Sequence, residues 1–258
     1  MQDKNAHIFV SGSSGGLGLL AGGKLLKQGH RVIFHARNAA RADELRADVA
    51  GVADIVVGDI GTVCGALDVA DQVNALGRCD AVIHNAGVGY GEGPRLTADE
   101  VPEIFGVNVL APYILTARID GPTRLVYLSS SMHRTAPDLD DMLWRRRRWL
   151  SSTAYSESKF YVTALAFAVA RLWPEVRSNA VDPGWVPTRM GGQGAPDDLD
   201  EGAATQVALA SGDDPMLSKL SGHYLHHRTM REPESNTRSR DIQEQLLALC
   251  RDISGVSI

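Results

Sequence analysis

The stretch Ile8-Phe9-Val10-Ser11-Gly12-Ser13-Ser14-Gly15-Gly16-Leu17-Gly18 decides the fold of this chain. Its apolar start predicts a buried strand, its glycine run predicts a tight turn, and the pattern from Gly16 onward predicts a helix. Unpaired N–H groups at a helix N-terminus attract a phosphate, and glycine lets the backbone approach that phosphate closely. The stretch therefore predicts an anion-binding turn in a first βαβ unit.

Two glycine registers compete within this turn. The pattern Gly16-x-Gly18-x-x-Ala21 fits a dinucleotide fingerprint, but it begins about four residues later than the turn should. The pattern Gly12-x-x-x-Gly16-x-Gly18 begins directly at the end of the strand, and we prefer it. Ser14 and Leu17 lie in the same turn. With the three glycines they are candidate contacts to a dinucleotide.

Short apolar runs alternate with amphipathic stretches along the rest of the chain. Strands are predicted over 6–10, 31–35, 54–57, 80–84, 124–129, 177–181 and 222–225. Helices are predicted over 16–28, 39–50, 62–76, 100–119, 153–173 and 240–252. Nearly all-apolar strands separated by helices predict a parallel sheet with helices on both faces. We expect a doubly wound α/β fold and a single domain over residues 1–258.

Composition excludes several classes of protein. In 258 residues, 44% are hydrophobic and 22% charged, which is ordinary globular usage rather than disorder or a fibrous repeat. A net charge of −5 offers no broad surface for nucleic acid. The three cysteines lie far apart in the sequence, which indicates neither a disulfide framework nor a metal site.

The sequence also predicts the compartment. Residues 1–7 are polar and lack the apolar core of a signal peptide. The longest apolar run, 161–170, is far short of the ~20 residues that a membrane span requires. We expect a cytoplasmic protein that binds neither membrane nor nucleic acid.

Two segments depart from the alternation of strands and helices. Segment 134–152 contains Trp144-Arg145-Arg146-Arg147-Arg148-Trp149, and segment 186–199 is rich in Gly, Pro and Asp. The arginine run predicts a solvated turn above packed tryptophans, with a phosphate-rich partner as the alternative. Segment 186–199 is typical of a mobile loop.

The end of the second predicted strand bears on the choice of dinucleotide. An NAD site usually places Asp or Glu ~20 residues beyond the glycine turn, on the ribose hydroxyls. Here the strand ends in His35-Ala36-Arg37-Asn38, and the first acid, Asp43, lies in the following helix. A bond from Arg37 to a 2′-phosphate is worth about 1.5–3 kcal/mol. We predict NADP(H) over NAD(H), with an ordinary surface arginine as the alternative.

Tyr155-Ser156-Glu157-Ser158-Lys159 places a tyrosine and a lysine one helical turn apart. A free phenol has a pKa near ~10 and is a poor acid–base group at neutral pH. A lysine ammonium one turn away favours the phenolate and lowers that pKa. By spacing alone, the pair is also compatible with an ordinary helix face.

Six motifs in order resemble the short-chain dehydrogenase/reductase family over nearly the whole chain. They are the Gly12/Gly16/Gly18 turn, His84-Asn85-Ala86-Gly87, Val107-Asn108-Val109, Ser129-Ser130-Ser131, Tyr155-x-x-x-Lys159 and Asp182-Pro183-Gly184-Trp185-Val186-Pro187-Thr188. The resemblance implies a Rossmann-type sheet of about seven parallel strands. His84 replaces the family's usual asparagine.

The resemblance also implies catalytic roles. Tyr155 is implied as the general acid that protonates a carbonyl oxygen, and Lys159 as the group that lowers its pKa and holds the nicotinamide ribose. Ser130 is implied as the hydrogen-bond partner of the substrate oxygen, with Ser129 or Ser131 open within one residue. Asn108 is implied in a water-mediated proton relay to the lysine.

Further residues are implied as cofactor contacts. Asp59 matches a position that contacts adenine, Asn85-Ala86-Gly87 matches the wall beside the adenosine ribose, and Thr188 matches a contact near the carboxamide and phosphates. The same segments add four candidate contacts, Ile60, Pro183, Gly184 and Val186. Ser130 and Tyr155 are 25 residues apart, against about half that number in the commonest family members.

The extra length between Ser130 and Tyr155 is an insertion, 134–152, similar to one in the retinol-dehydrogenase-like and light-dependent protochlorophyllide-reductase-like branch. The chain as a whole resembles the retinol-dehydrogenase-like and carbonyl-reductase-like branch of the family. The resemblance implies an NADPH-dependent reductase of a small ketone or aldehyde, with 186–199 as a substrate-binding loop. Two alternatives stay open: an NADP(H) sensor without turnover, and a secondary-alcohol dehydrogenase with the same residues. A homodimer, a homotetramer and a monomer are all compatible with the resemblance.

Overall fold

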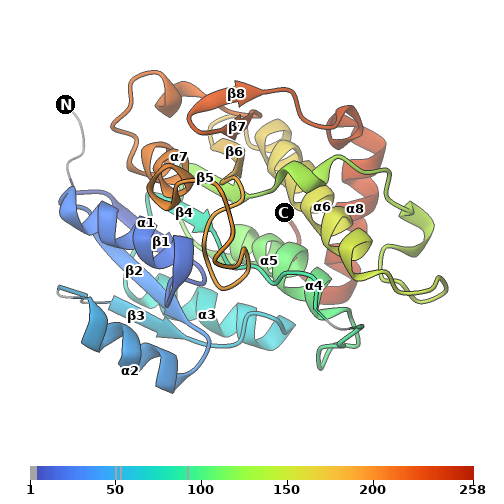
Figure 1. Ribbon diagram of the computed structural model, residues 1–258, viewed down its shortest axis with the longest axis horizontal. Coiled ribbons are helices and arrows are strands. Elements are labelled where there is room, and N and C mark those ends of the chain that lie inside the picture. The colour runs from blue at the N-terminus through green and yellow to red at the C-terminus, as the bar shows by residue number, and fades with distance from the viewer. Residues whose placement is uncertain (1–4, 50, 53, 92) are drawn as a thin grey trace.

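The computed structural model describes residues 5–49, 51–52, 54–91 and 93–258. At its centre lies an eight-stranded sheet in the order β3-β2-β1-β4-β5-β6-β7-β8 (Figure 1). Neighbouring strands pair parallel, except that β7 and β8 pair antiparallel. The strands are β1 (His7–Val10), β2 (Arg31–Ala36), β3 (Asp54–Val57), β4 (Ala81–His84), β5 (Arg124–Leu128), β6 (Arg177–Asp182), β7 (Tyr224–His226) and β8 (Thr229–Arg231).

Helices cover both faces of this sheet. The helices are α1 (Gly16–Lys27), α2 (Ala39–Asp48), α3 (Val63–Ala75), α4 (Glu103–Phe105), α5 (Ala111–Arg118), α6 (Ser151–Leu172), α7 (Leu199–Ser211) and α8 (Arg240–Ser254). One apolar core joins the sheet to α3, α5 and α6, and a second joins the opposite face to α1, α2 and α7. The last helix, α8, packs on α6.

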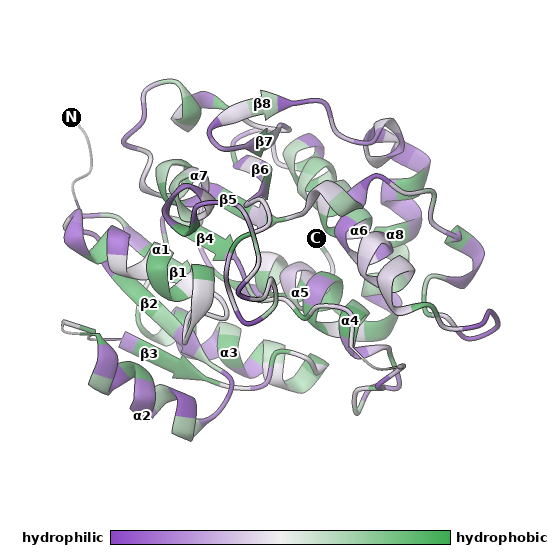
Figure 2. Cartoon of the chain, in the orientation of Figure 1, coloured by the Kyte–Doolittle hydropathy of each residue, from purple (hydrophilic) through white to green (hydrophobic). Residues whose placement is uncertain are grey.

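The sheet reverses its order between β1 and β4, which makes it doubly wound. Strands β1 and β4 are completely buried and almost wholly apolar, as expected of strands covered on both sides. Figure 2 shows apolar residues along these inner strands and polar residues on the outward helix surfaces. The carboxyl ends of β1 and β4 meet at this reversal, where such folds place their ligands.

The predicted fold class and all seven predicted strands are confirmed, within two residues at each end. The eighth strand was not predicted, because its three exposed residues carry no apolar alternation. Helix α7 was not predicted either. Its alanine-rich sequence is buried almost all round, so it shows little amphipathic period. The predicted end of the second helix, Ala50, lies outside the described residues.

The prediction of one regular helix over 100–119 is wrong. The structure has α4, a π-helical turn η1 (Gly106–Leu110) and then α5, which follow one another without a break. A π-turn inserts an extra residue into the helical hydrogen-bond ladder and is frequent at functional sites. Asn108, one of the predicted catalytic residues, lies in this turn.

Among the described residues, no helix is both long and apolar enough to cross a membrane.

Candidate functional site

The glycine turn between β1 and α1 forms the floor of the candidate site. Gly12 has a positive φ of 62°, and a Cβ atom there would lie 2.7 Å from the Ala86 Cα atom. A side chain at Gly18 would collide with the Asn85 amide and the Gly12 carbonyl. Gly12 opens the preferred register two residues after β1, whereas Gly16, where the rival register begins, is already the first residue of α1. Gly12 and Gly18 therefore let the turn pack directly against Ala86 and Asn85, which follow β4.

Hydrogen bonds also hold the glycine turn against the residues that follow β4. The Asn85 amide donates to the Ser11 and Gly12 carbonyls at 2.9 and 3.1 Å. The Ser11 hydroxyl accepts from the backbone N–H groups of Asn85 and Ala86. Asn85 and Ala86 are thus positioned against the turn.

His35, near the end of β2, also supports the turn, although no sequence motif pointed to it. Its Nδ1 accepts from the Gly12 N–H at 2.9 Å, so its Nε2 carries the proton and donates to the Gly58 carbonyl at 2.9 Å. Burial lowers the pKa of His35, which favours this neutral form. The imidazole links the ends of β1, β2 and β3.

The start of α1 fits a phosphate group. Its N-cap is Gly15, which makes no side-chain capping bond, and the first turn contains no acidic residue. The first N–H groups of a helix have no partner within the helix, and the helix dipole favours an anion there. Ser14, Gly16 and Leu17 line this end of the helix. The donor set therefore suits a dinucleotide pyrophosphate.

The predicted residues after β6 reach the same helix start. The Thr188 methyl group would lie 3.7 Å from a Cβ atom at Gly16. On α7, a Cβ atom at Gly202 would crowd the Val186 side chain, the Pro183 carbonyl and Leu17. Gly184 has a φ of 82° that favours glycine. Gly202 was missed at the sequence level because α7 itself was not predicted.

The far end of the site, beside β2 and β3, contains Arg37, Asp59 and Ile60. Arg37 directly follows β2 and is exposed, as is Asp59 after β3, whereas Ile60 is buried. Arg41, which the sequence analysis did not select, donates to the Ser14 carbonyl at 2.8 Å and forms an ion pair with Glu44. Two arginine side chains therefore belong to the segment that follows β2.

Tyr155, on α6, is buried with its hydroxyl directed at the thioether of Met190, 3.9 Å away. Burial raises its pKa to about 12, although a hydrogen bond with the Ser130 side chain acts in the opposite direction. The predicted lowering of this pKa by the lysine is wrong for the protein without cofactor, because the cost of burying a phenolate dominates. The phenol is therefore protonated at neutral pH and can act as a proton donor.

Lys159 lies one turn further along α6, with its Nζ atom 5.6 Å from the centre of the Tyr155 ring. The ammonium is buried and donates to the Leu128 carbonyl at 2.8 Å. Burial lowers its pKa to about 8, and the nearby Asp182 carboxylate opposes that change. Asp182, at the end of β6, was not selected as a functional residue, because its proximity to Lys159 appears only in the folded sheet.

Asn108 connects α6 to the loop after β4. Its amide accepts from the Val88 N–H at 2.8 Å and donates to the Val88 carbonyl and to the Ser158 hydroxyl. A Cβ atom at Gly87 would lie 3.4 Å from the Asn108 Oδ1 atom and 3.6 Å from the Lys159 Nζ atom. The π-turn therefore brings Asn108, Gly87 and Lys159 together.

The structure distinguishes the three candidate serines. The Ser129 hydroxyl is buried and bonded to Thr163 at 2.6 Å, whereas Ser131 is exposed. Ser130 caps the short helix η2 (Ser131–His133) through the Met132 N–H and also bonds with Tyr155. Of the three, Ser130 is the one whose side chain interacts with Tyr155.

Segment 134–152 packs against the start of α6. Arg147 forms a two-pronged ion pair with Glu157, at 2.7 and 2.5 Å, and stacks on the Trp144 ring. Arg145, Arg146 and Arg148 are exposed. The predicted solvated turn above tryptophans thus holds for three of the four arginines, and Arg147 turns inward.

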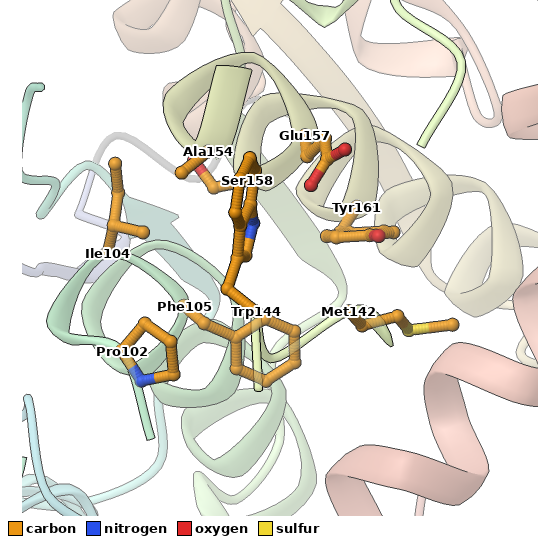
Figure 3. Close-up of a pocket in the computed structure, with 9 residues that line it drawn as sticks. All are labelled: Pro102, Ile104, Phe105, Met142, Trp144, Ala154, Glu157, Ser158 and Tyr161. Carbon is orange, nitrogen blue, oxygen red and sulfur yellow. The ribbon is translucent and has the colours of Figure 1, made fainter. Parts of the chain in front are cut away.

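A small pocket lies between this segment and α6. Figure 3 shows the Trp144 indole in its middle, with Ile104 to its left, Phe105 below it, and Glu157 and Tyr161 to its right. Ser158, the hydrogen-bond partner of Asn108, also lines this pocket. The segment therefore contacts the helix that carries Tyr155 and Lys159.

Comparison with known proteins identifies the family of the chain. The sequence model described as short chain dehydrogenase matches residues 6–120. The chain is 38% identical to the short-chain dehydrogenase chyC of Penicillium rubens, over 98% of this chain and 99% of that protein. This chain belongs to the short-chain dehydrogenase family.

More distant relatives of this short-chain dehydrogenase include retinol dehydrogenase 13 of Homo sapiens, which is 26% identical over 71% of this chain and 60% of that protein. Among solved structures, a crystal structure of a protein from Mycobacterium paratuberculosis superposes with a TM-score of 0.84. It is 22% identical and covers 98% of this chain and 94% of that one, which supports the fold. The resemblance to a retinol-dehydrogenase-like branch is therefore found among the relatives as well.

Proposed function

We propose that this short-chain dehydrogenase is an NADPH-dependent reductase of a ketone or aldehyde. The observation that carries the proposal is the arrangement around Tyr155: a protonated buried phenol, Ser130 beside it and Lys159 one turn away. These are the groups needed to bind a carbonyl oxygen and give it one proton. A bound nicotinamide cofactor supplies the hydride.

In this proposal each residue has a separate task. The Ser130 hydroxyl donates a hydrogen bond to the carbonyl oxygen and orients it toward the phenol. Tyr155 donates its proton to that oxygen. Lys159 holds the cofactor ribose and stabilises the phenolate that remains. Asn108 orders the loop at Val88 and supports return of a proton toward Lys159.

The glycine turn and its neighbours hold the cofactor. The N–H groups at the start of α1 would bind the pyrophosphate, and Thr188 lies at the same end of the helix. Asp59 and Ile60 would contact the adenine, and Asn85-Ala86-Gly87 would contact its ribose. Arg37 and Arg41 favour a 2′-phosphate, and this supports NADP(H) over NAD(H).

Two segments complete the proposed substrate site. Residues 134–152 form an insertion that contacts α6, and residues 186–199 form the substrate-binding loop, with Met190 over the phenol. Closure of such a loop excludes water from the reacting carbonyl. Substrate entry requires Met190 to move away from Tyr155.

The test is the Tyr155→Phe variant, which keeps the ring and removes the proton. NADPH oxidation with an accepted ketone is expected to fall at least ~100-fold, the usual contribution of a positioned acid. Fluorescence titration is expected to show unchanged NADPH binding. Near wild-type turnover in the variant would show that Tyr155 is not the proton donor.

A broad panel of ketones and aldehydes tests the alternative of a sensor. If wild-type protein binds NADPH and oxidises it with none of them, the chain is a cofactor-binding protein without turnover. Incubation with NADP⁺ and secondary alcohols measures the opposite reaction direction.

A further inference from the structure

The approach to Tyr155 is bordered by an aromatic ring and a thioether. The Tyr90 ring stands edge-on to the Tyr155 ring, with 5.7 Å between centroids, and the Tyr90 side chain is 61% exposed. The Met190 sulfur lies 3.9 Å from the phenol oxygen, and the Met190 side chain is 50% exposed. Both flanking side chains are uncharged, and both remain open to a ligand.

The buried side of the same site is also apolar. Tyr155 belongs to an apolar cluster with Ile104 and Ala154, and four partly buried side chains pack against it, Val88, Met132, Trp144 and Trp149. These come from the loop after β4, the turn after β5 and segment 134–152. Three separate parts of the chain thus contribute apolar side chains to the cluster that contains Tyr155.

Gly89 explains how Met190 reaches its place. A Cβ atom at Gly89 would lie 2.9 Å from the Met190 Cγ atom, so a side chain there would displace Met190. The thioether therefore lies between the loop that carries Tyr90 and the Tyr155 hydroxyl. A substrate carbonyl that accepts the Tyr155 proton must take the place of this sulfur, with Met190 moved to its side.

We propose that the substrate is an uncharged carbonyl compound that carries an aromatic ring, which binds between Tyr90 and Met190. Aromatic rings prefer edge-to-face or offset contacts with one another, which Tyr90 already makes with Tyr155. Thioether sulfur makes favourable contacts with ring edges. Exposed apolar side chains that gather beside a reactive group indicate a ligand that covers them. This inference rests on the proposed reductase function.

A matched pair of ketones tests it: 4-phenylbutan-2-one and 4-cyclohexylbutan-2-one. Two methylene groups separate the ring from the carbonyl in both ketones, so their intrinsic reactivity toward hydride is nearly the same. The cyclohexyl ring is the more apolar of the two, so hydrophobic burial alone favours the cyclohexyl ketone. We expect kcat/KM for the phenyl ketone to exceed that for the cyclohexyl ketone by about 5- to 10-fold, the size of one or two aromatic contacts.

Variants of Tyr90 and Met190 test whether these two residues cause the preference for the phenyl ketone. Tyr90→Leu removes the ring and is expected to bring the phenyl-to-cyclohexyl ratio of kcat/KM to about one or below, whereas Tyr90→Phe retains it. Met190→Leu keeps the volume, loses the sulfur and is expected to reduce the ratio in part. Met230→Leu, an equally exposed methionine on the edge strand β8, is the matched control and leaves the ratio unchanged.

The outcomes separate this inference from the function on which it rests. Reduction of both ketones with equal kcat/KM, or a ratio that Tyr90→Leu does not change, overturns the aromatic substrate and leaves the reductase in place. If protein that binds NADPH reduces neither ketone and no member of the carbonyl panel, the proposed function is overturned. The inference about the aromatic substrate is then overturned with it.

Discussion

At the scale of one residue, the catalytic role that we propose for Lys159 opposes the stability of the fold. Its buried ammonium has a pKa of about 8, against 10.5 for a free lysine. The folded state therefore binds this proton less tightly than the unfolded state does, which costs about 3 kcal/mol of stability below pH 8. The cost disappears as the pH rises from about 8 to 10.5, because the unfolded lysine then loses its proton as well.

We predict that Lys159→Met raises the free energy of unfolding near neutral pH by up to about 3 kcal/mol, while ketone reduction is lost. Urea denaturation of both proteins measures this gain, which should narrow as the pH approaches 10.5. The exposed Lys27→Met, also on a helix, is the control and should change stability by less than about 0.5 kcal/mol. A Lys159→Met variant less stable than wild type at neutral pH contradicts the prediction.

At the scale of elements, the ion pair between Arg147 and Glu157 joins segment 134–152 to α6. Glu157 is only 2% exposed, and its side chain bonds to Arg147 at both carboxylate oxygens. We predict that Arg147→Met lowers the free energy of unfolding by about 3–5 kcal/mol, because an unpaired carboxylate is left buried. Chemical denaturation of the purified variant measures this loss.

The same arginine run supplies the control for that prediction. Arg148 is exposed, so Arg148→Met should change stability by less than about 0.5 kcal/mol. Adding Glu157→Gln to Arg147→Met removes the unpaired charge and should restore part of the loss. Equal effects of the Arg147 and Arg148 substitutions contradict a specific role for the buried pair.

At the scale of the whole molecule, cofactor binding should stabilise the fold. A ligand present at 100 times its Kd stabilises the folded state by about 2.7 kcal/mol, and each kcal/mol raises Tm by about 2–4 °C in a protein of this size. We predict a larger rise with NADPH than with the same concentration of NADH. Differential scanning fluorimetry with both cofactors measures it.

Arg37→Gln should reduce the NADPH-induced rise in Tm and weaken NADPH binding about tenfold or more, with little effect on NADH, because one charge-assisted contact to the 2′-phosphate is lost. Arg46→Gln, an exposed arginine on α2 that pairs with Asp43, is the matched control. Equal rises in Tm with the two cofactors contradict the proposed NADP(H) preference.

Local rules explain why so much of this molecule was predictable. A strand between helices has an apolar run of recognisable length, and a glycine with positive φ has few substitutes, so β1, α1 and the turn at Gly12 follow from adjacent residues. Likewise, a tyrosine and a lysine four residues apart in a helix share one face whatever the rest of the fold. Where no local signal existed, as in the alanine-rich α7 and the short β8, the prediction failed.

The sequence by itself thus determined the doubly wound sheet, the glycine turn and the Tyr155 and Lys159 pair. Only the tertiary structure decided that Ser130 rather than Ser129 faces Tyr155 and that His35 holds Gly12. It likewise decided that Tyr90 and Met190 flank the phenol, with Asp182 near the lysine. The physical reason is that these contacts join residues far apart in the chain. Their distances depend on strand order and side-chain packing, which no local pattern of residues encodes.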